Sequence, residues 1–117
     1  MQTDHPHGIT ITPHPGRLVV VFAGQTVVDT TEALDLVEGS MRPVVYVPRQ
    51  DADMSFFEPS TRQTRCPFKG DASYFTLRAG GREAQNAVWS YEEPLPGAAR
   101  ISGHLAFYPD QVEMREG

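Results

Sequence analysis

The fold is decided by residues 69–92, which read KGDASYFTLRAGGREAQNAVWSYE. The two glycines at 80–81 stand between two runs rich in aromatic and apolar residues, a pattern typical of a β-hairpin with a two-residue turn. This turn places Arg78 opposite Glu83, and an opposite-charge pair across two strands supports the register. We therefore expect an antiparallel hairpin that turns at these glycines.

The same register, continued without a bulge, gives one face of the hairpin three large aromatic side chains, each opposite a small residue. The pairs are Tyr74 with Ala87, Trp89 with Ala72, and Tyr91 with Gly70. Lys69 then meets Glu92 at the open end of the hairpin. Because the polar tips of Tyr and Trp need partners or water, this aromatic face reads either as core or as the lining of a ligand cavity.

Outside this hairpin, short apolar runs alternate with turn residues about every 8 to 12 residues, which indicates further strands. The expected strands cover residues 17–22, 26–29, 43–47, 100–108 and 112–114, and the first two form a hairpin near Gly24. Residues 29–38 suit a strand and a short helix equally, and residues 60–67 read as a polar loop. The pattern predicts an all-β, mainly antiparallel barrel-like or sandwich-like domain with at most one short helix.

Length and charge exclude several classes of protein. The chain has 117 residues, which is one domain, and its net charge of −5 argues against generic nucleic-acid binding. No apolar run approaches the roughly 18 residues of a membrane helix, so we expect no membrane insertion. A single cysteine excludes an internal disulfide and suits a reducing compartment, so we expect a cytoplasmic protein.

Residues 1–16 differ in composition from the rest of the chain. They carry three of the four histidines, His5, His7 and His14, among Pro, Thr and Gly. We expect a flexible N-terminal arm here and a single folded domain over residues 17–115. Because no carboxylate or cysteine is spaced to complete a coordination shell, we expect no metal site.

The only cysteine and the only lysine share the short segment Cys66-Pro67-Phe68-Lys69-Gly70, whereas the other nine basic residues are all arginine. An ammonium beside a thiol favours the nucleophilic thiolate, so Cys66 and Lys69 are our candidate catalytic residues. The alternative is an inert, buried cysteine. Arg49, Arg62 and Arg65, together with Lys69, form either a local anion site or a set of solvated loop residues.

Three elements in this order resemble the bacterial and fungal domain-of-unknown-function family 427. They are Tyr-x-Pro at 46–48, Cys-Pro-x-Lys-Gly at 66–70 and Trp-x-Tyr at 89–91, and the similarity covers roughly residues 17–115. The resemblance implies a small β-tent-like or partly open barrel domain, in a family also catalogued as nucleotidyltransferase-like. Zinc-binding β-tent proteins use paired CxxC motifs, which this chain lacks, so the resemblance implies no metal.

The resemblance further implies that six residues form one site: Tyr46, Cys66, Lys69, Tyr74, Trp89 and Tyr91. Our first hypothesis is an enzyme or receptor whose aromatic pocket binds a small anionic or nucleotide-like ligand, steered by Arg62 or Arg65. The alternative is a non-catalytic protein-interaction or structural module. The sequence leaves open the ligand, any cofactor, whether a reaction is catalysed, and whether the chain forms a homodimer.

Overall fold

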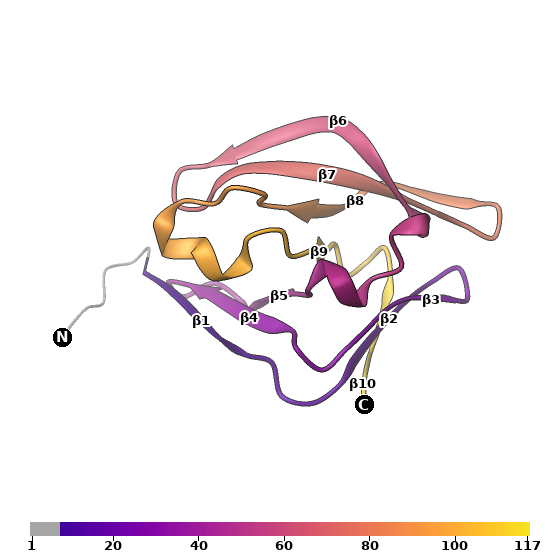
Figure 1. Cartoon of the computed structure of the whole chain (residues 1–117), viewed down its shortest axis with the longest axis horizontal. Helices are drawn as coiled ribbons and strands as arrows, with labels where there is room; N and C mark the ends of the chain where they lie inside the picture. Colours follow the sequence, from indigo (N-terminus) through magenta and orange to yellow (C-terminus); the bar gives the residue numbers. More distant parts are fainter. Residues whose placement is uncertain (1–7) are drawn as a thin grey trace.

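A computed structural model describes residues 8–117 and confirms the all-β, mainly antiparallel prediction (Figure 1). The strands are β1 (Ile9–Pro13), β2 (Leu18–Phe22), β3 (Gln25–Thr30), β4 (Leu34–Glu38), β5 (Val44–Tyr46), β6 (Phe57–Cys66), β7 (Gly70–Ala79), β8 (Arg82–Ser90), β9 (Ala106–Phe107) and β10 (Glu113–Glu116). The helical segments of this part of the chain are short 3₁₀ turns, η1 (Arg49–Asp51), η2 (Met54–Phe56) and η3 (Pro96–Ile101). None of them is long and apolar enough to cross a membrane.

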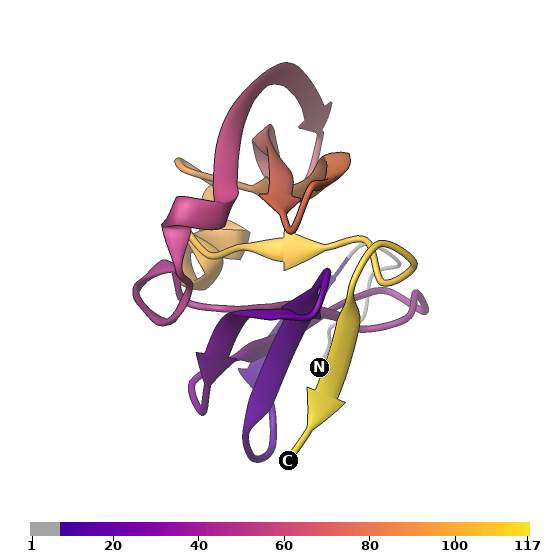
Figure 2. The same ribbon diagram turned by 90° about the vertical axis from the view of Figure 1, so that its right-hand side faces the viewer.

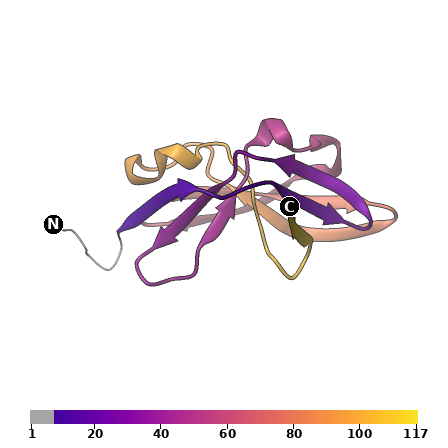
Figure 3. The same ribbon diagram turned by 90° about the horizontal axis from the view of Figure 1, so that it is seen from below.

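The strands form three antiparallel sheets, none of which closes into a barrel. The largest has the order β6-β7-β8-β9, and the two smaller sheets have the orders β1-β4-β5 and β10-β2-β3. In the side view the large sheet lies above, and β2, β3 and β10 run down beneath it (Figure 2). Seen from below, the β1-β4-β5 sheet occupies one end of the molecule and the β2–β3 hairpin the other (Figure 3).

Two clusters of buried side chains hold these sheets together. The first joins the β2–β3 hairpin to the large sheet and is built on Leu18, Val20, Leu77 and Val88. The second joins the β1-β4-β5 sheet to the same large sheet through Leu36, Tyr46, Tyr74 and Tyr91, and Ala98 and Ile101 of η3 close its end. Both small sheets therefore pack against the same large sheet.

The hairpin expected near Gly24 is confirmed, and its turn is centred on Ala23 and Gly24. Both residues have positive φ, 52° and 77°, as a type I′ turn between two strands requires. The strand before this hairpin, β1, and the strand after it, β4, pair with each other. Residues 34–38 are therefore a strand and not a short helix.

The prediction of a flexible arm over residues 1–16 is wrong for its second half. Ile9–Pro13 form β1, and Ile9 and Ile11 pack against the second cluster. Apolar residues at alternate positions allow this otherwise polar segment to add a strand to the edge of a sheet. His5 and His7 lie outside the described residues.

The loop predicted at 60–67 is also wrong, because residues 60–66 belong to β6, which pairs with β7. The segment is polar since β6 is the edge strand of its sheet and most of its side chains face solvent. Pro59 is tolerated at this edge, and the pairing register shifts between Pro59 and Gln63. Polarity alone therefore could not separate an exposed edge strand from a loop.

The strand predicted over residues 100–108 is shorter than expected. Residues 96–101 form η3, which begins with Pro96, and only Ala106 and Phe107 pair with β8 as β9. The expected C-terminal strand is confirmed as β10, which pairs with β2. The chain therefore ends beside its first hairpin.

The turn of the β7–β8 hairpin is confirmed, with Arg78 opposite Glu83, but the predicted register fails further along. Leu77 faces Ala84 and Phe75 faces Val88, so Thr76 alone faces residues 85–87. β8 therefore has two more residues than β7 in this stretch, which is a β-bulge. An even shift preserves the two faces of the strand, so the aromatic side chains stay on one face, and Tyr74 now lies opposite Trp89 instead of Ala87.

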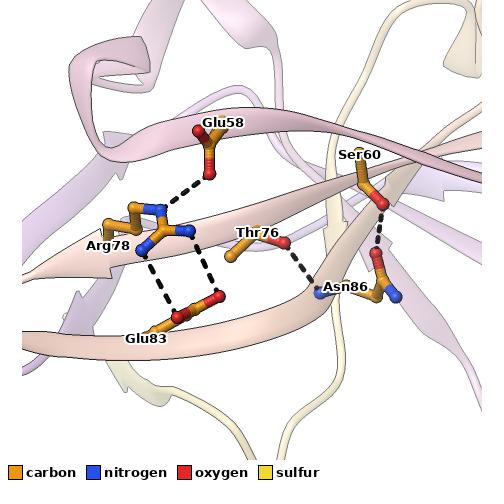
Figure 4. A network of polar contacts seen from close by, with 6 residues as sticks. All are labelled: Glu58, Ser60, Thr76, Arg78, Glu83 and Asn86. Carbon is orange, nitrogen blue, oxygen red and sulfur yellow. Dashed lines mark hydrogen bonds and ion pairs between the residues drawn. The ribbon is translucent and has the colours of Figure 1, made fainter.

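Two hydrogen bonds hold this bulge (Figure 4). Asn86 has a φ of 55°, and its backbone N–H donates to Oγ1 of the buried Thr76 over 3.2 Å. The hydroxyl of Ser60 on β6 donates to Oδ1 of Asn86 over 2.5 Å. Asn tolerates the left-handed backbone conformation better than most residues, so this position suits the bulge.

We predict that Thr76→Val destabilises the domain. The Asn86 N–H loses its acceptor at a partly buried position, and an unsatisfied buried group costs about 1–3 kcal/mol. Arg78→Ala is the control, because it removes exposed ion pairs from the same hairpin and should leave the stability close to that of the wild type. Urea unfolding measures both. Equal losses in the two variants would show that the bulge bond does not stabilise the hairpin.

His14 lies at the bend between β1 and β2 and joins the two small sheets. Its Nδ1 lies 2.8 Å from Asp35 on β4, and its Nε2 lies 2.8 Å from Glu116 on β10. Burial disfavours the imidazolium, but the hydrogen bonds to Glu116 and Asp35 outweigh it and raise the pKa of His14 above its ordinary value of 6.5.

A raised pKa means that His14 adds stability fully below about pH 6.5 and loses it as the pH rises through the folded-state pKa. We therefore predict that the gap in unfolding free energy between the wild type and His14→Gln is larger at about pH 5.5 than at about pH 9. Urea titrations at the two pH values measure it. An identical difference in unfolding free energy at the two pH values would show that the charge of His14 does not stabilise the fold.

Candidate functional site

A cavity of about 300 Å³ lies between the small β1-β4-β5 sheet and the large sheet. Five of the predicted site residues line it: Tyr46 from β5, Lys69 from the β6–β7 turn, Tyr74 from β7, Trp89 from β8, and Tyr91 just after β8. The structure therefore brings these five residues, which span positions 46 to 91 of the sequence, together around one cavity.

The other three predicted residues lie outside this cavity. Cys66 is half-buried at the end of β6, where it packs against the second cluster. Arg65 is exposed and pairs with Asp71 at 2.8 Å. The guanidinium of Arg62 lies 4.9 Å from the centre of the Tyr74 ring and lines a neighbouring hollow. The nucleophilic role of Cys66 stays a prediction.

Lys69 forms an ion pair with Glu38, the last residue of β4, with 2.5 Å between Nζ and Oε1. The two side chains are only 12% and 14% exposed. The predicted pairing of Lys69 with Glu92 is wrong, because the ladder of β7 begins at Gly70 and Glu92 pairs with Arg49 instead. The ion pair links the two sheets across one end of the cavity.

The backbone around Gly70 fixes the position of Lys69. The carbonyl of Lys69 accepts a hydrogen bond from the N–H of Leu95 over 2.9 Å. Gly70 has a φ of 111°, and a Cβ there would lie 3.4 Å from that same Leu95 nitrogen. Only glycine combines this backbone conformation with so close an approach, which explains the Lys-Gly order in the sequence.

The ion pair holds Lys69 as an ammonium ion. Burial acts against the charged form, but the hydrogen bond to Glu38 and the nearby negative groups outweigh it and raise the pKa of Lys69 above 10.5. Lys69 therefore serves as a cation and hydrogen-bond donor at neutral pH rather than as a free amine.

An aromatic wall forms the next part of the cavity. The indole N–H of Trp89 donates to the hydroxyl of the buried Tyr46 over 3.2 Å, and the two rings meet edge to face with centres 6.4 Å apart. Burial, opposed by this hydrogen bond, raises the pKa of Tyr46. The Tyr108 ring lies 4.8 Å from the Trp89 ring and is partly exposed at the mouth of the cavity.

Tyr74 has a different environment from the other phenols. Its hydroxyl lies 2.9 Å from Oγ1 of Thr64 on β6. Burial would raise its pKa, but the hydrogen bond with Thr64 and the charge of Arg62 over its ring outweigh burial and lower the pKa below the usual value. The hydroxyl of Tyr74 is therefore held by Thr64 of the neighbouring edge strand β6.

Sequence reasoning missed several residues of the cavity, above all Glu38, Met41, Arg42 and Tyr108. A signal was present for Glu38, because a strand over residues 34–38 places this carboxylate on the same face as Leu34 and Leu36. Met41 and Arg42 lie in the connection between β4 and β5, where no periodic pattern identifies the inward side.

A comparison with protein families agrees with the sequence resemblance. A family model described as a domain of unknown function (DUF427) matches residues 10–116, which is nearly the whole of the described chain. No curated protein matched the sequence.

We predict that Lys69→Met destabilises the domain, because it leaves the Glu38 carboxylate shielded and unpaired. Loss of one partner costs about 3–5 kcal/mol in a completely buried pair, and the remaining exposure here reduces the expected loss to about 2 kcal/mol. The double variant Lys69→Met/Glu38→Leu leaves no charge behind and should recover most of the stability. Chemical unfolding compares them. A double variant as unstable as the single one would show that the ion pair is not the cause.

Proposed function

We propose that this chain, which belongs to the DUF427 family, binds one small, flat ring compound that carries an anionic group. The observation that carries this proposal is an ion pair, Lys69 with Glu38, shielded from solvent in the wall of an aromatic cavity. The ring of the ligand lies against Trp89 and Tyr108, and its anionic group lies at the mouth of the cavity.

The size and lining of the cavity support a ligand of one or two rings. Its volume of about 300 Å³ is at the lower end of the range for small-molecule sites. Aromatic side chains on several sides suit a flat, unsaturated ring, which stacks against them with offset or edge-on geometry.

The shielded ion pair supports a polar contact with the ligand. Replacing a buried ion pair by apolar residues is often neutral or stabilising, so stability alone gives little reason for a pair at this position. The carboxylate of Glu38 can accept, and the ammonium of Lys69 can donate, further hydrogen bonds to a bound molecule. A ring with adjacent donor and acceptor atoms fits such a pair.

Arg42 supports an anionic group on the ligand. It lines the same cavity, and the described residues give it no ion-pair partner. Six of the ten basic residues form ion pairs, and of the other four, all within residues 8–117, only Arg42 lines this cavity. A guanidinium can bind a carboxylate or phosphate with two parallel hydrogen bonds. A nucleotide-like ligand is one compound of this class.

If the domain also catalyses a reaction, Lys69 contributes to it as a fixed positive charge, because its ion pair with Glu38 keeps it protonated.

A second candidate function is a protein-interaction module. Met41, Phe68 and Tyr108 are its supporting observation, because they are large apolar side chains exposed on the surface.

Trp89 gives a direct test, because it is the only tryptophan and its fluorescence reports on the cavity. We titrate the protein with nucleoside monophosphates, the matching nucleosides and aromatic carboxylates. At least one anionic ring compound should change the Trp89 emission saturably, and Arg42→Ala should weaken its binding about tenfold or more, as loss of a charge-assisted contact does. Arg65→Ala is the control, since Arg65 is exposed and paired with Asp71.

The result that contradicts the proposal is an emission that none of these compounds changes. In that case the interaction module is tested with the double variant Met41→Ser/Phe68→Ser, whose loss of a specific protein partner would support the second candidate.

A further inference from the structure

Tyr91 has a buried hydroxyl without a hydrogen-bond partner. The residue is 6% exposed and lines the cavity, and no side chain or backbone group of residues 8–117 bonds to its hydroxyl. The two neighbouring phenols differ in this respect, because Tyr46 accepts from Trp89 and Tyr74 bonds with Thr64. The ammonium of Lys69 lies 5.9 Å from the centre of the Tyr91 ring.

An unpaired hydroxyl in such a position needs an explanation, because buried polar groups in folded proteins are almost always hydrogen-bonded. A phenylalanine would fill the same space and bury no unpaired oxygen. The packing of the second cluster therefore explains the ring of Tyr91 but not its hydroxyl. A bound molecule that presents an acceptor atom would explain it.

The surroundings of Tyr91 select the kind of acceptor. Burial is the main reason why the pKa of Tyr91 is raised above its ordinary value. Negative charge on the neighbouring groups raises it further, and these groups are Tyr46, Cys66, Tyr74 and Glu38. The hydroxyl therefore stays protonated and donates. The ion pair of Glu38 with Lys69 leaves no net charge at this end of the cavity, so the cost of burial disfavours a further negative charge there. A neutral carbonyl oxygen fits there better than a carboxylate oxygen.

We propose that the Tyr91 hydroxyl donates a hydrogen bond to a neutral carbonyl oxygen at the inner end of the ligand, which makes the ligand an aromatic or heterocyclic amide. Its ring N–H or amide N–H lies within reach of the Glu38 carboxylate, and its anionic group points outward to Arg42. This inference rests on the proposed function. It adds which polar group the ligand presents to Tyr91 and how the ligand is oriented in the cavity.

Three benzoates of similar size test this polarity: 4-carbamoylbenzoate carries a neutral amide opposite the carboxylate, 4-methylbenzoate carries a methyl group there, and terephthalate carries a second carboxylate. Their dissociation constants are measured by Trp89 fluorescence for the wild type, Tyr91→Phe and Tyr74→Phe. We expect the wild type to bind the amide about tenfold or more tightly than the methyl compound, because a site built to donate rejects a partner that cannot accept. It should also bind the amide more tightly than terephthalate, because the second carboxylate of terephthalate would be buried. Tyr91→Phe should lose the preference for the amide over the methyl compound, and Tyr74→Phe should keep it.

Binding of the methyl compound or of terephthalate as tightly as the amide, or an unchanged preference in Tyr91→Phe, would overturn the inference while leaving the proposed function intact. Binding of none of the three would overturn this inference. The proposed function would fall with it only if the nucleoside monophosphates also left the Trp89 emission unchanged.

The stability of the free protein gives a second measurement. Tyr91→Phe should be at least as stable as the wild type and Tyr74→Phe less stable, so a marked loss in Tyr91→Phe would show that the hydroxyl has a partner within the protein and overturn the inference.

Discussion

The ion pair between Lys69 and Glu38 is the interaction on which the cavity depends, because it joins the end of β4 to the β6–β7 turn. Beside it, the buried side chains of the second cluster pack the small β1-β4-β5 sheet against the large sheet. The pair is positioned by backbone geometry: Gly70 allows the turn to approach Leu95, and the Lys69 carbonyl is bonded there. The ion pair and the β6–β7 turn therefore fix the shape of the cavity together, and a change in either of them alters the site.

The bulge in β8 sets the opposite wall of the cavity. Thr76 faces residues 85–87, which moves Trp89 to a position opposite Tyr74 and lets its indole N–H reach Tyr46 on the small sheet. The hydrogen bond between Trp89 and Tyr46 is thus a second polar link between the two sheets. Two polar links at separate places hold the sheets apart at a defined distance, and the space between them is lined by phenols.

The sequence predicts local features of this fold well and long-range features less well. The turns at Gly24 and at Gly-Gly 80–81 follow from residues that accept positive φ, and the aromatic face of the hairpin survives the bulge because its shift is even. The sequence could not show that β6 is a strand, since an exposed edge strand is as polar as a loop, nor that Glu38 is the partner of Lys69, since 31 residues separate them. It grouped Cys66 and Arg65 with the site because they are close in sequence, whereas strand geometry turns Arg65 outward to Asp71.

The central claim is that the cavity between the two sheets is a binding site, and the indole N–H of Trp89 tests it most directly. The chain has one tryptophan, so this group gives one side-chain signal in a ¹H–¹⁵N NMR spectrum. On addition of 4-carbamoylbenzoate, we expect this signal and the backbone amide signals of Lys69 and Tyr91 to shift saturably, while those of the turn at residues 80–81 stay in place. An indole signal that does not move at the highest probe concentration, or shifts confined to residues outside the cavity, would contradict the account.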